Sequence, residues 1–156
     1  MKNILFSAIL YILVVSCNIA PGSYPYAEIY EIEASESAVI AAVNKVKDQN
    51  PAFCVPAVSI VSGETNTYTT LSDGRRDNSD YWYHVYFYYQ KENEIIYMWT
   101  RPFNNQRTHI GLVSINEGLE LGNWKDINHD FSYFENKTQK QRFVDRVLSK
   151  ILANLE

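Results

Sequence analysis

The sequence YWYHVYFYYQKENEIIYMWTR, residues 81–101, decides the fold of this chain. Aromatic and β-branched residues suit a pleated, half-buried surface, so the stretch predicts two long strands at the centre of a sheet. The break between them is Lys91-Glu92-Asn93, and asparagine tolerates the left-handed backbone that a tight turn needs. We therefore expect a three-residue loop that pairs Gln90 with Glu94.

A second turn follows directly and leads into a third long strand. Residues 102–105, Pro-Phe-Asn-Asn, suit a hairpin loop, and residues 108–115 have the composition of a strand. This turn places Trp99 opposite Ile110. Gly111 lies inside the third strand, which predicts a bulge or the close approach of a neighbouring group.

The alternation of side chains along these strands predicts two unlike sheet faces. The more apolar face, which we assign to the helices, carries Val85, Phe87, Tyr97, Trp99, Ile110 and Leu112. The other face carries the candidate ligand-binding residues Trp82, His84, Tyr86, Tyr88, Met98 and His109. A slip of one residue in either turn would exchange the faces.

Two amphipathic helices flank the strands. Ser35 or Ser37 caps the first helix, and Asn50-Pro51 ends it, because a residue before proline is pushed out of the helical region. Thr138 and Gln141 form a capping-box pattern that begins a C-terminal helix of about 17 residues with a continuous apolar stripe.

The remaining segments complete the predicted fold. Residues 27–33 predict a short edge strand, and residues 65–71 predict one further strand. Residues 124–131 predict one helical turn with Trp124 directed inward. The fold class is therefore α+β: a two-layer sandwich in which an antiparallel β-meander carries an N-terminal and a C-terminal helix on one face.

The N-terminus, MKNILFSAILYILVVSC, has the layout of a secretory signal, with a cation before an apolar stretch that is too short to span a membrane by itself. Its last four residues, Val14-Val15-Ser16-Cys17, resemble the lipobox of bacterial lipoproteins. The resemblance implies a signal peptide over residues 1–16 and acylation of Cys17, whose acyl chains anchor the protein stably. The alternatives are an ordinary signal peptide cut near Ala20 and an uncleaved anchor.

The same resemblance implies a place in the cell envelope. Asn18 stands where many inner-membrane lipoproteins have aspartate, which implies the outer membrane rather than the inner one. Residues 17–26 contain proline and glycine and are expected to tether the lipid to a single α+β domain, residues 27–156. The membrane is thus the first expected partner, through the lipid on Cys17.

Composition and motifs exclude several functions. The formal net charge is −4 and no basic stripe exists, so nucleic acid is not an expected partner. The sequence has no G-x-S-x-G, H-E-x-x-H or C-x-x-C motif and no glycine-rich phosphate loop. We expect no cofactor, no metal site and no assigned catalytic residue. Cys54, the other cysteine, has apolar neighbours in sequence and is expected to be structural and buried.

The histidines are the best candidates for chemistry. In the predicted register, His84 and His109 both neighbour Thr100, about 10 Å apart, which is too far to share one zinc ion. No carboxylate is expected to converge on them, and hydrogen bonds to tyrosine hydroxyls are the simplest account of both. The charged residues 75–80 are expected to form a solvated loop tip rather than a site.

A sheet face rich in tryptophan and tyrosine predicts a non-enzymatic domain that binds a ligand, an envelope protein, a peptide or a glycan. The alternative is a hydrolase or isomerase with His84 or His109 as general base and a tyrosine such as Tyr86 as acid. A deep cleft that enclosed either histidine beside a carboxylate would favour the enzyme. A third possibility is that residues 51–80 cover this face and make it core.

Overall fold

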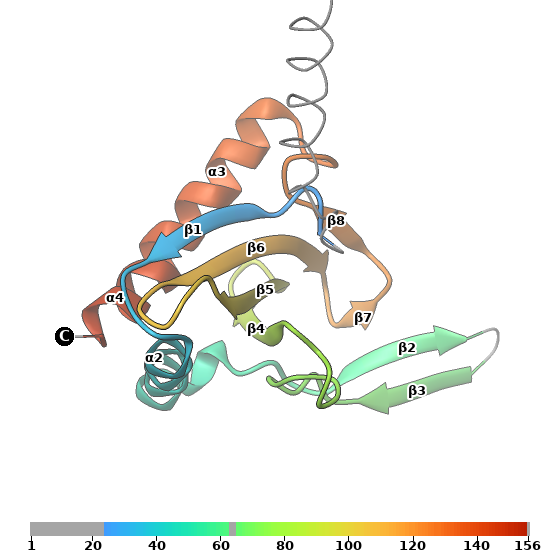
Figure 1. Cartoon of the computed structure of the whole chain (residues 1–156). Coiled ribbons are helices and arrows are strands. Elements are labelled where there is room, and N and C mark those ends of the chain that lie inside the picture. The colour runs from blue at the N-terminus through green and yellow to red at the C-terminus, as the bar shows by residue number, and fades with distance from the viewer. Residues whose placement is uncertain (1–23, 63–64, 156) are drawn as a thin grey trace, which may run out of the picture.

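The computed structural model of the chain describes residues 24–62 and 65–155, so Cys17 and the predicted signal peptide lie outside the described residues. It confirms a mixture of helices and strands with an antiparallel sheet. The elements in chain order are β1 (Glu28–Ile32), α2 (Glu36–Gln49), the short helix η2 (Pro51–Phe53), β2 (Val58–Ser62), β3 (Thr65–Thr69), β4 (Tyr83–Tyr89), β5 (Glu94–Pro102), β6 (Thr108–Glu117), β7 (Glu120–Leu121), β8 (Trp124–Asp126), α3 (Tyr133–Phe143), the π-helical turn η3 (Val144–Leu148) and α4 (Ser149–Ala153) (Figure 1).

The main sheet has the strand order β1-β6-β5-β4, and β8 also pairs with β6. β1 lies at the edge, as its short sequence predicted. β8 is a strand where we predicted a helical turn, and β2 with β3 forms a hairpin where we predicted one strand. This hairpin extends away from the main sheet, and β2 also pairs in parallel with β7 (Figure 1).

The ends of the helices follow local capping chemistry. The Ser35 hydroxyl accepts the Ala38 N–H at 3.3 Å, and α2 ends at Gln49, as predicted. α3 begins earlier than predicted, because Ser132 and Glu135 form the capping box. The Thr138 hydroxyl lies within the helix and donates to a backbone carbonyl of the preceding turn.

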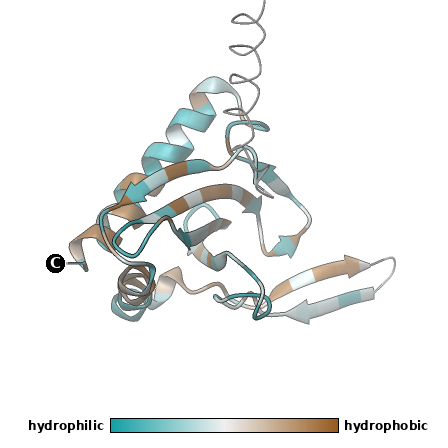
Figure 2. Ribbon diagram, viewed as in Figure 1, coloured by the Kyte–Doolittle hydropathy of each residue, from teal (hydrophilic) through white to brown (hydrophobic). Residues whose placement is uncertain are grey.

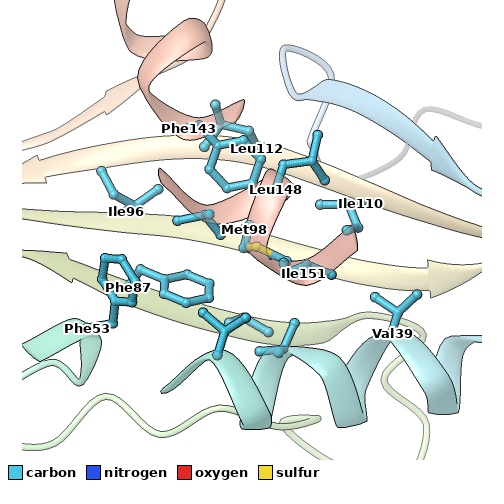
Figure 3. Packing of buried hydrophobic residues seen from close by; sticks show 14 of the residues in the cluster. Val39, Phe53, Phe87, Ile96, Met98, Ile110, Leu112, Phe143, Leu148 and Ile151 are labelled. Carbon is cyan, nitrogen blue, oxygen red and sulfur yellow. The ribbon is translucent and has the colours of Figure 1, made fainter. Parts of the chain in front are cut away.

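One large core cluster joins the helices to the main sheet. Its members alternate along the strands, as one face of a sheet requires. Figure 3 shows them meeting side chains of α2 and of the C-terminal helical segment. Among the most buried are Val39, Val43, Val85, Phe87, Met98, Ile110, Leu112, Phe143, Val147 and Ile151. The first half of α3 is largely hydrophilic, whereas its continuation is more apolar (Figure 2).

The predicted registers of both turns were wrong by one residue. Tyr89 pairs with Glu94, so residues 90–93 form the loop, and Asn93 takes the expected left-handed conformation with φ 55°. Pro102 pairs with Thr108 after the second loop. The physical reason is that β5 is buried on both faces, so its apolar pattern does not specify which face meets the helices.

The slip exchanges the two faces of β5 and leaves those of β4 as predicted. Val85 and Phe87 lie in the main core, as expected. Met98 pairs with Val85 and is fully buried in the same core, so its assignment to the binding face was wrong. Tyr97 and Trp99, expected under the helices, belong to a second cluster.

Candidate functional site

A second, aromatic cluster occupies the face of the sheet that alternates with the main core. Tyr97, Trp99 and Val113 are its buried members. The partly buried side chains that pack against them are Tyr24, Ala27, Trp82, Tyr86 and Trp124. The rings come from β4 and the residue before it, from β5 and β8, and from the segment before β1, so this arrangement depends on the tertiary fold.

A glycine makes room for one of these rings. A Cβ atom on Gly111 would lie 2.4 Å from the indole of Trp99, so the indole occupies the space that a side chain would need. The close approach predicted for Gly111 is confirmed. The irregularity in the pairing of β5 with β6 lies at Val113 instead, because Tyr97 pairs with Ser114 and Met98 with Leu112, whereas Gly111 pairs regularly with Trp99.

A hollow of about 450 Å³ opens over this cluster. Tyr86 and Tyr97 stack on each other, with ring centroids 5.1 Å apart and planes 19° apart, and Trp124 meets Tyr97 edge-on at 6.1 Å. The full lining is Tyr24, Pro25, Tyr26, Ala27, Leu71, Arg76, Tyr86, Tyr97, Val113, Ser114, Leu121, Trp124 and Asp126. Its volume lies in the range of small-ligand sites.

A line of hydrogen bonds runs from a buried histidine to the hollow. His84 Nε2 lies 2.8 Å from Asp80 Oδ2, and His84 Nδ1 lies 2.6 Å from the hydroxyl of Tyr97. The Tyr97 hydroxyl is in turn 2.6 Å from that of Tyr24. His84 is 2% exposed and does not line the hollow, so Tyr97 stands between it and any ligand.

The charge state of each group in this line follows from its surroundings. Backbone N–H groups, first that of Arg76, hold the pKa of Asp80 at about 2. Burial lowers the pKa of His84, and its hydrogen bond with Asp80 opposes this only in part. Burial raises the pKa of Tyr97 far above its usual value, which keeps the phenol protonated. Near neutral pH the line is therefore an aspartate, a neutral imidazole and two phenols.

The protonation of His84 decides the direction of these hydrogen bonds. In the structure the Tyr97 hydroxyl donates to that of Tyr24, which corresponds to His84 Nδ1–H donating to Tyr97. A neutral imidazole with its proton on Nε2, toward Asp80, reverses both bonds, so that Tyr24 donates to Tyr97 and Tyr97 donates to Nδ1. The hydroxyl proton of Tyr24, a lining residue, is free for a ligand only in the first arrangement.

His109 belongs to different surroundings. It pairs with Arg101, whereas His84 pairs with Trp99. Its ring packs on Phe103 at a centroid distance of 4.8 Å, and Nε2 lies 3.5 Å from Glu31. Each histidine thus has a carboxylate nearby, so the expectation that none converges was wrong.

The structure separates the six predicted binding residues. Tyr86 lines the hollow, Trp82 packs beside it on Tyr24, and His84 lies behind it. Tyr88 donates to Asn93 at the end of the hairpin, Met98 lies in the main core, and His109 is absent from the lining.

Sequence reasoning missed most of the lining. Tyr97 and Trp124 were placed on the wrong face and in the wrong kind of element. Arg76 and Asp80 were assigned to a solvated tip, although Arg76 lines the hollow and Asp80 is hydrogen-bonded to His84. The concentration of charge in residues 75–80 was the one signal that could have identified them.

The cover over the aromatic face differs from the one considered from sequence. Of the residues between 51 and 80 that the structure describes, only Leu71 and Arg76 line the hollow. Residues 24–26, which we assigned to the tether, pack on the face instead: Tyr24 contacts the rings of Trp82, His84, Tyr97 and Trp99. Cys54 is exposed, so its predicted burial was wrong.

Three further findings complete the description. Across residues 24–62 and 65–155, no helix combines the length and apolar character needed to cross a membrane. Within these same ranges, no group of three or more His, Cys, Asp or Glu side chains could hold a metal ion. Searches against protein-family models, curated proteins and solved structures found no match to this chain.

Proposed function

We propose that this protein is a non-enzymatic binding domain that takes a small ligand in the hollow over its aromatic cluster. The observation that carries the proposal is the lining itself, in which aromatic rings stand beside a few polar side chains, the composition of a small-molecule site. Such rings offer a large rigid contact area together with a polar edge.

The position of His84 supports binding over catalysis. The enzyme alternative requires a histidine that reaches the substrate in an enclosed cleft beside a carboxylate. Asp80 supplies the carboxylate, but His84 is buried behind Tyr97, and His109 does not line the hollow. A general base would have to act through the phenol of Tyr97, whose raised pKa disfavours giving up its proton.

Nuclear magnetic resonance can test ligand binding in the hollow. The probes are monosaccharides, amino acids and small aromatic acids, added to the ¹⁵N-labelled domain, and the readout is the indole N–H signal of Trp124. We expect at least one class to shift this signal and Trp124→Leu to abolish that binding. Tyr133→Ala is the control, because Tyr133 is 76% exposed and does not line the hollow. A Trp124 signal that no probe shifts would contradict the proposal.

We further propose that the domain is held on the bacterial envelope, at the outer membrane, by lipid on Cys17. The support is the sequence Val14-Val15-Ser16-Cys17. A glycan, a peptide or an envelope protein would then be the source of the ligand. Labelling of cells with an alkyne fatty acid tests the anchor: Cys17→Ser should lose the label, and Cys54→Ser should keep it. Label retained by the Cys17 variant would remove the anchor from the proposal.

We also propose a two-layer arrangement, with α2 and the C-terminal helical segment on the same sheet face. The support is that Val39 and Ile151 share one core cluster with Val85 and Leu112. The aromatic cluster would then lie on the sheet face opposite the helices that the structure describes.

A further inference from the structure

Arg76 is a guanidinium without a carboxylate partner among the residues that the structure describes. Other arginines of the protein form ion pairs: Arg75 lies 2.6 Å from Glu36, and Arg146 lies 2.9 Å from Glu92. Arg101 also lacks a carboxylate partner in the described chain, but it lies over the rings of Tyr81 and Trp99. Within residues 24–62 and 65–155, Arg76 alone combines a guanidinium that lacks a carboxylate partner with a place in the lining of the hollow.

The surroundings of Arg76 join a positive charge to an aromatic surface. Arg76 and Tyr86 line the same hollow, where the charge of Arg76 acts on the Tyr86 hydroxyl, and Tyr86 stacks on Tyr97. A guanidinium carries five N–H donors in a plane. A ligand that packs against these rings can therefore reach Arg76 with an anionic group at its edge.

Hydrogen-bond acceptors complete the lining. Asp126 and Ser114 line the same hollow as Arg76, and the two are paired residues on adjacent strands β8 and β6. A carboxylate and a hydroxyl accept hydrogen bonds from ligand hydroxyls. The Asp126 charge also favours a ligand with a single negative charge over a doubly charged phosphate, because like charges in one small site repel.

We propose that the hollow binds an acidic sugar of the uronic acid type. This rests on the proposed ligand-binding function of the same hollow. The apolar C–H face of the pyranose packs against the aromatic lining of the hollow, the carboxylate pairs with Arg76, and ring hydroxyls bind Asp126 and Ser114. The class follows from needing all three features in one small molecule: a flat apolar face, several hydroxyls and one carboxylate.

Three probes separate these requirements. D-Glucuronate has all three features, D-glucose lacks the carboxylate, and benzoate has the carboxylate and a flat ring but no hydroxyls. Each is titrated into the ¹⁵N-labelled protein at neutral pH, with the Trp124 indole signal as the readout. We expect glucuronate to bind about tenfold more tightly than glucose or better, as a charge-assisted pair in a partly dry site allows. Benzoate should bind more weakly than glucuronate.

Matched arginine variants test the assigned contact. Arg76→Gln should reduce glucuronate binding to the level of glucose, and Arg76→Lys should restore only part of the difference, because an ammonium lacks the bidentate geometry. Arg101→Gln removes the same charge outside the lining and should leave the preference intact. Arg76 is an exposed side chain, so its variants are expected to fold, and their amide spectra verify this.

The outcomes distinguish the sugar class from the binding function. Glucose bound as tightly as glucuronate, or benzoate bound as tightly with the same dependence on Arg76, would overturn the acidic sugar and leave a ligand site in the hollow. A glucuronate preference that survives in Arg76→Gln would also overturn it. A Trp124 signal that none of these probes or those of the preceding test shifts would overturn both proposals.

Discussion

At the scale of single residues, His84 and Gly111 show how the aromatic cluster is built. Both ring nitrogens of His84 are hydrogen-bonded, one to Asp80 and one to Tyr97, which satisfies a polar side chain that would otherwise be costly to bury. Gly111 leaves the space that the Trp99 indole occupies. The contribution of each residue to the stability of the fold can therefore be tested separately.

The stability of the fold should depend on pH through His84. Burial lowers the pKa of His84 in the folded state, so the unfolded chain binds more protons below its ordinary pKa of about 6.5. Stability is therefore present above about pH 6.5 and is lost as the pH falls below it, by at most about 1.4 kcal/mol per pH unit for this one group. Urea unfolding at pH 7.5 and pH 5.5 measures the loss.

The matched variant for this measurement is His84→Gln, which cannot titrate but keeps a side-chain amide near Asp80. Its loss of stability between the two pH values should be smaller than that of the parent, because the other histidines are common to both. The carboxylate of Asp80, with its pKa at about 2, titrates only in stronger acid. Equal losses in both proteins would refute the role of His84.

Gly111→Ala should destabilise the protein by about 1–3 kcal/mol, because the new Cβ would overlap the Trp99 indole and force repacking. Urea unfolding gives the free energy. The double variant with Trp99→Leu is the control: once the indole is absent, the added methyl should cost clearly less than it does in the parent. An alanine variant as stable as the parent would show that the indole moves freely.

At the scale of elements, the C-terminal helical segment is held both by its apolar face and by charged contacts. Arg142 pairs with Glu94, and Arg146 pairs with Glu92, so both arginines bind the β4–β5 hairpin. Their guanidinium groups lie 5.1 and 5.0 Å from the ring of Tyr89. Partly exposed ion pairs contribute modestly, so most of the attachment comes from buried apolar side chains.

Adjacent residues of α4 test this division. Ile151→Ala should cost about 2–5 kcal/mol, because Ile151 is completely buried in the main core. Leu152→Ala truncates a side chain of the same size that is 43% exposed, so the loss in the free energy of unfolding should stay within about 0.5–1 kcal/mol. Denaturant unfolding compares both with the parent. Similar costs at the two positions would mean that this helix does not pack as described.

At the scale of the whole molecule, the residues before β1 close the aromatic cluster. The Ala27 N–H donates to the Tyr24 carbonyl at 3.3 Å, which turns the chain over the sheet. The Tyr24 ring then meets Trp82 at 5.6 Å and Trp99 at 6.2 Å. A segment that resembles a tether in sequence is thus part of the site.

Tyr24→Ala should expose the tryptophans of the cluster. We expect stronger quenching of tryptophan fluorescence by acrylamide and a loss of stability of about 1–3 kcal/mol, because a partly buried aromatic contact is removed. Tyr133→Ala, at a tyrosine that is 76% exposed, should change neither quantity appreciably. If Tyr24→Ala behaved like Tyr133→Ala, residues 24–26 would act only as a tether.

The sequence by itself determined the features that depend on neighbouring residues. The first helix begins after Ser35, because this serine caps it, and ends before Asn50, because a residue before proline is pushed out of the helical region. The aromatic runs around residues 90–93 formed a hairpin, and Asn93 took a left-handed turn conformation. Gly111 marked a close approach because only a missing side chain could admit the Trp99 indole.

Only the tertiary structure decided the register and the composition of the site. β5 is buried on both faces, so either register places apolar side chains in a core, and hydrophobic alternation cannot choose between them. The hollow gathers Tyr24, Arg76, Tyr97 and Trp124 from segments far apart in the chain. No local pattern specifies such contacts, because they form through the pairing of β8 with β6 and the folding of the N-terminal segment over the sheet.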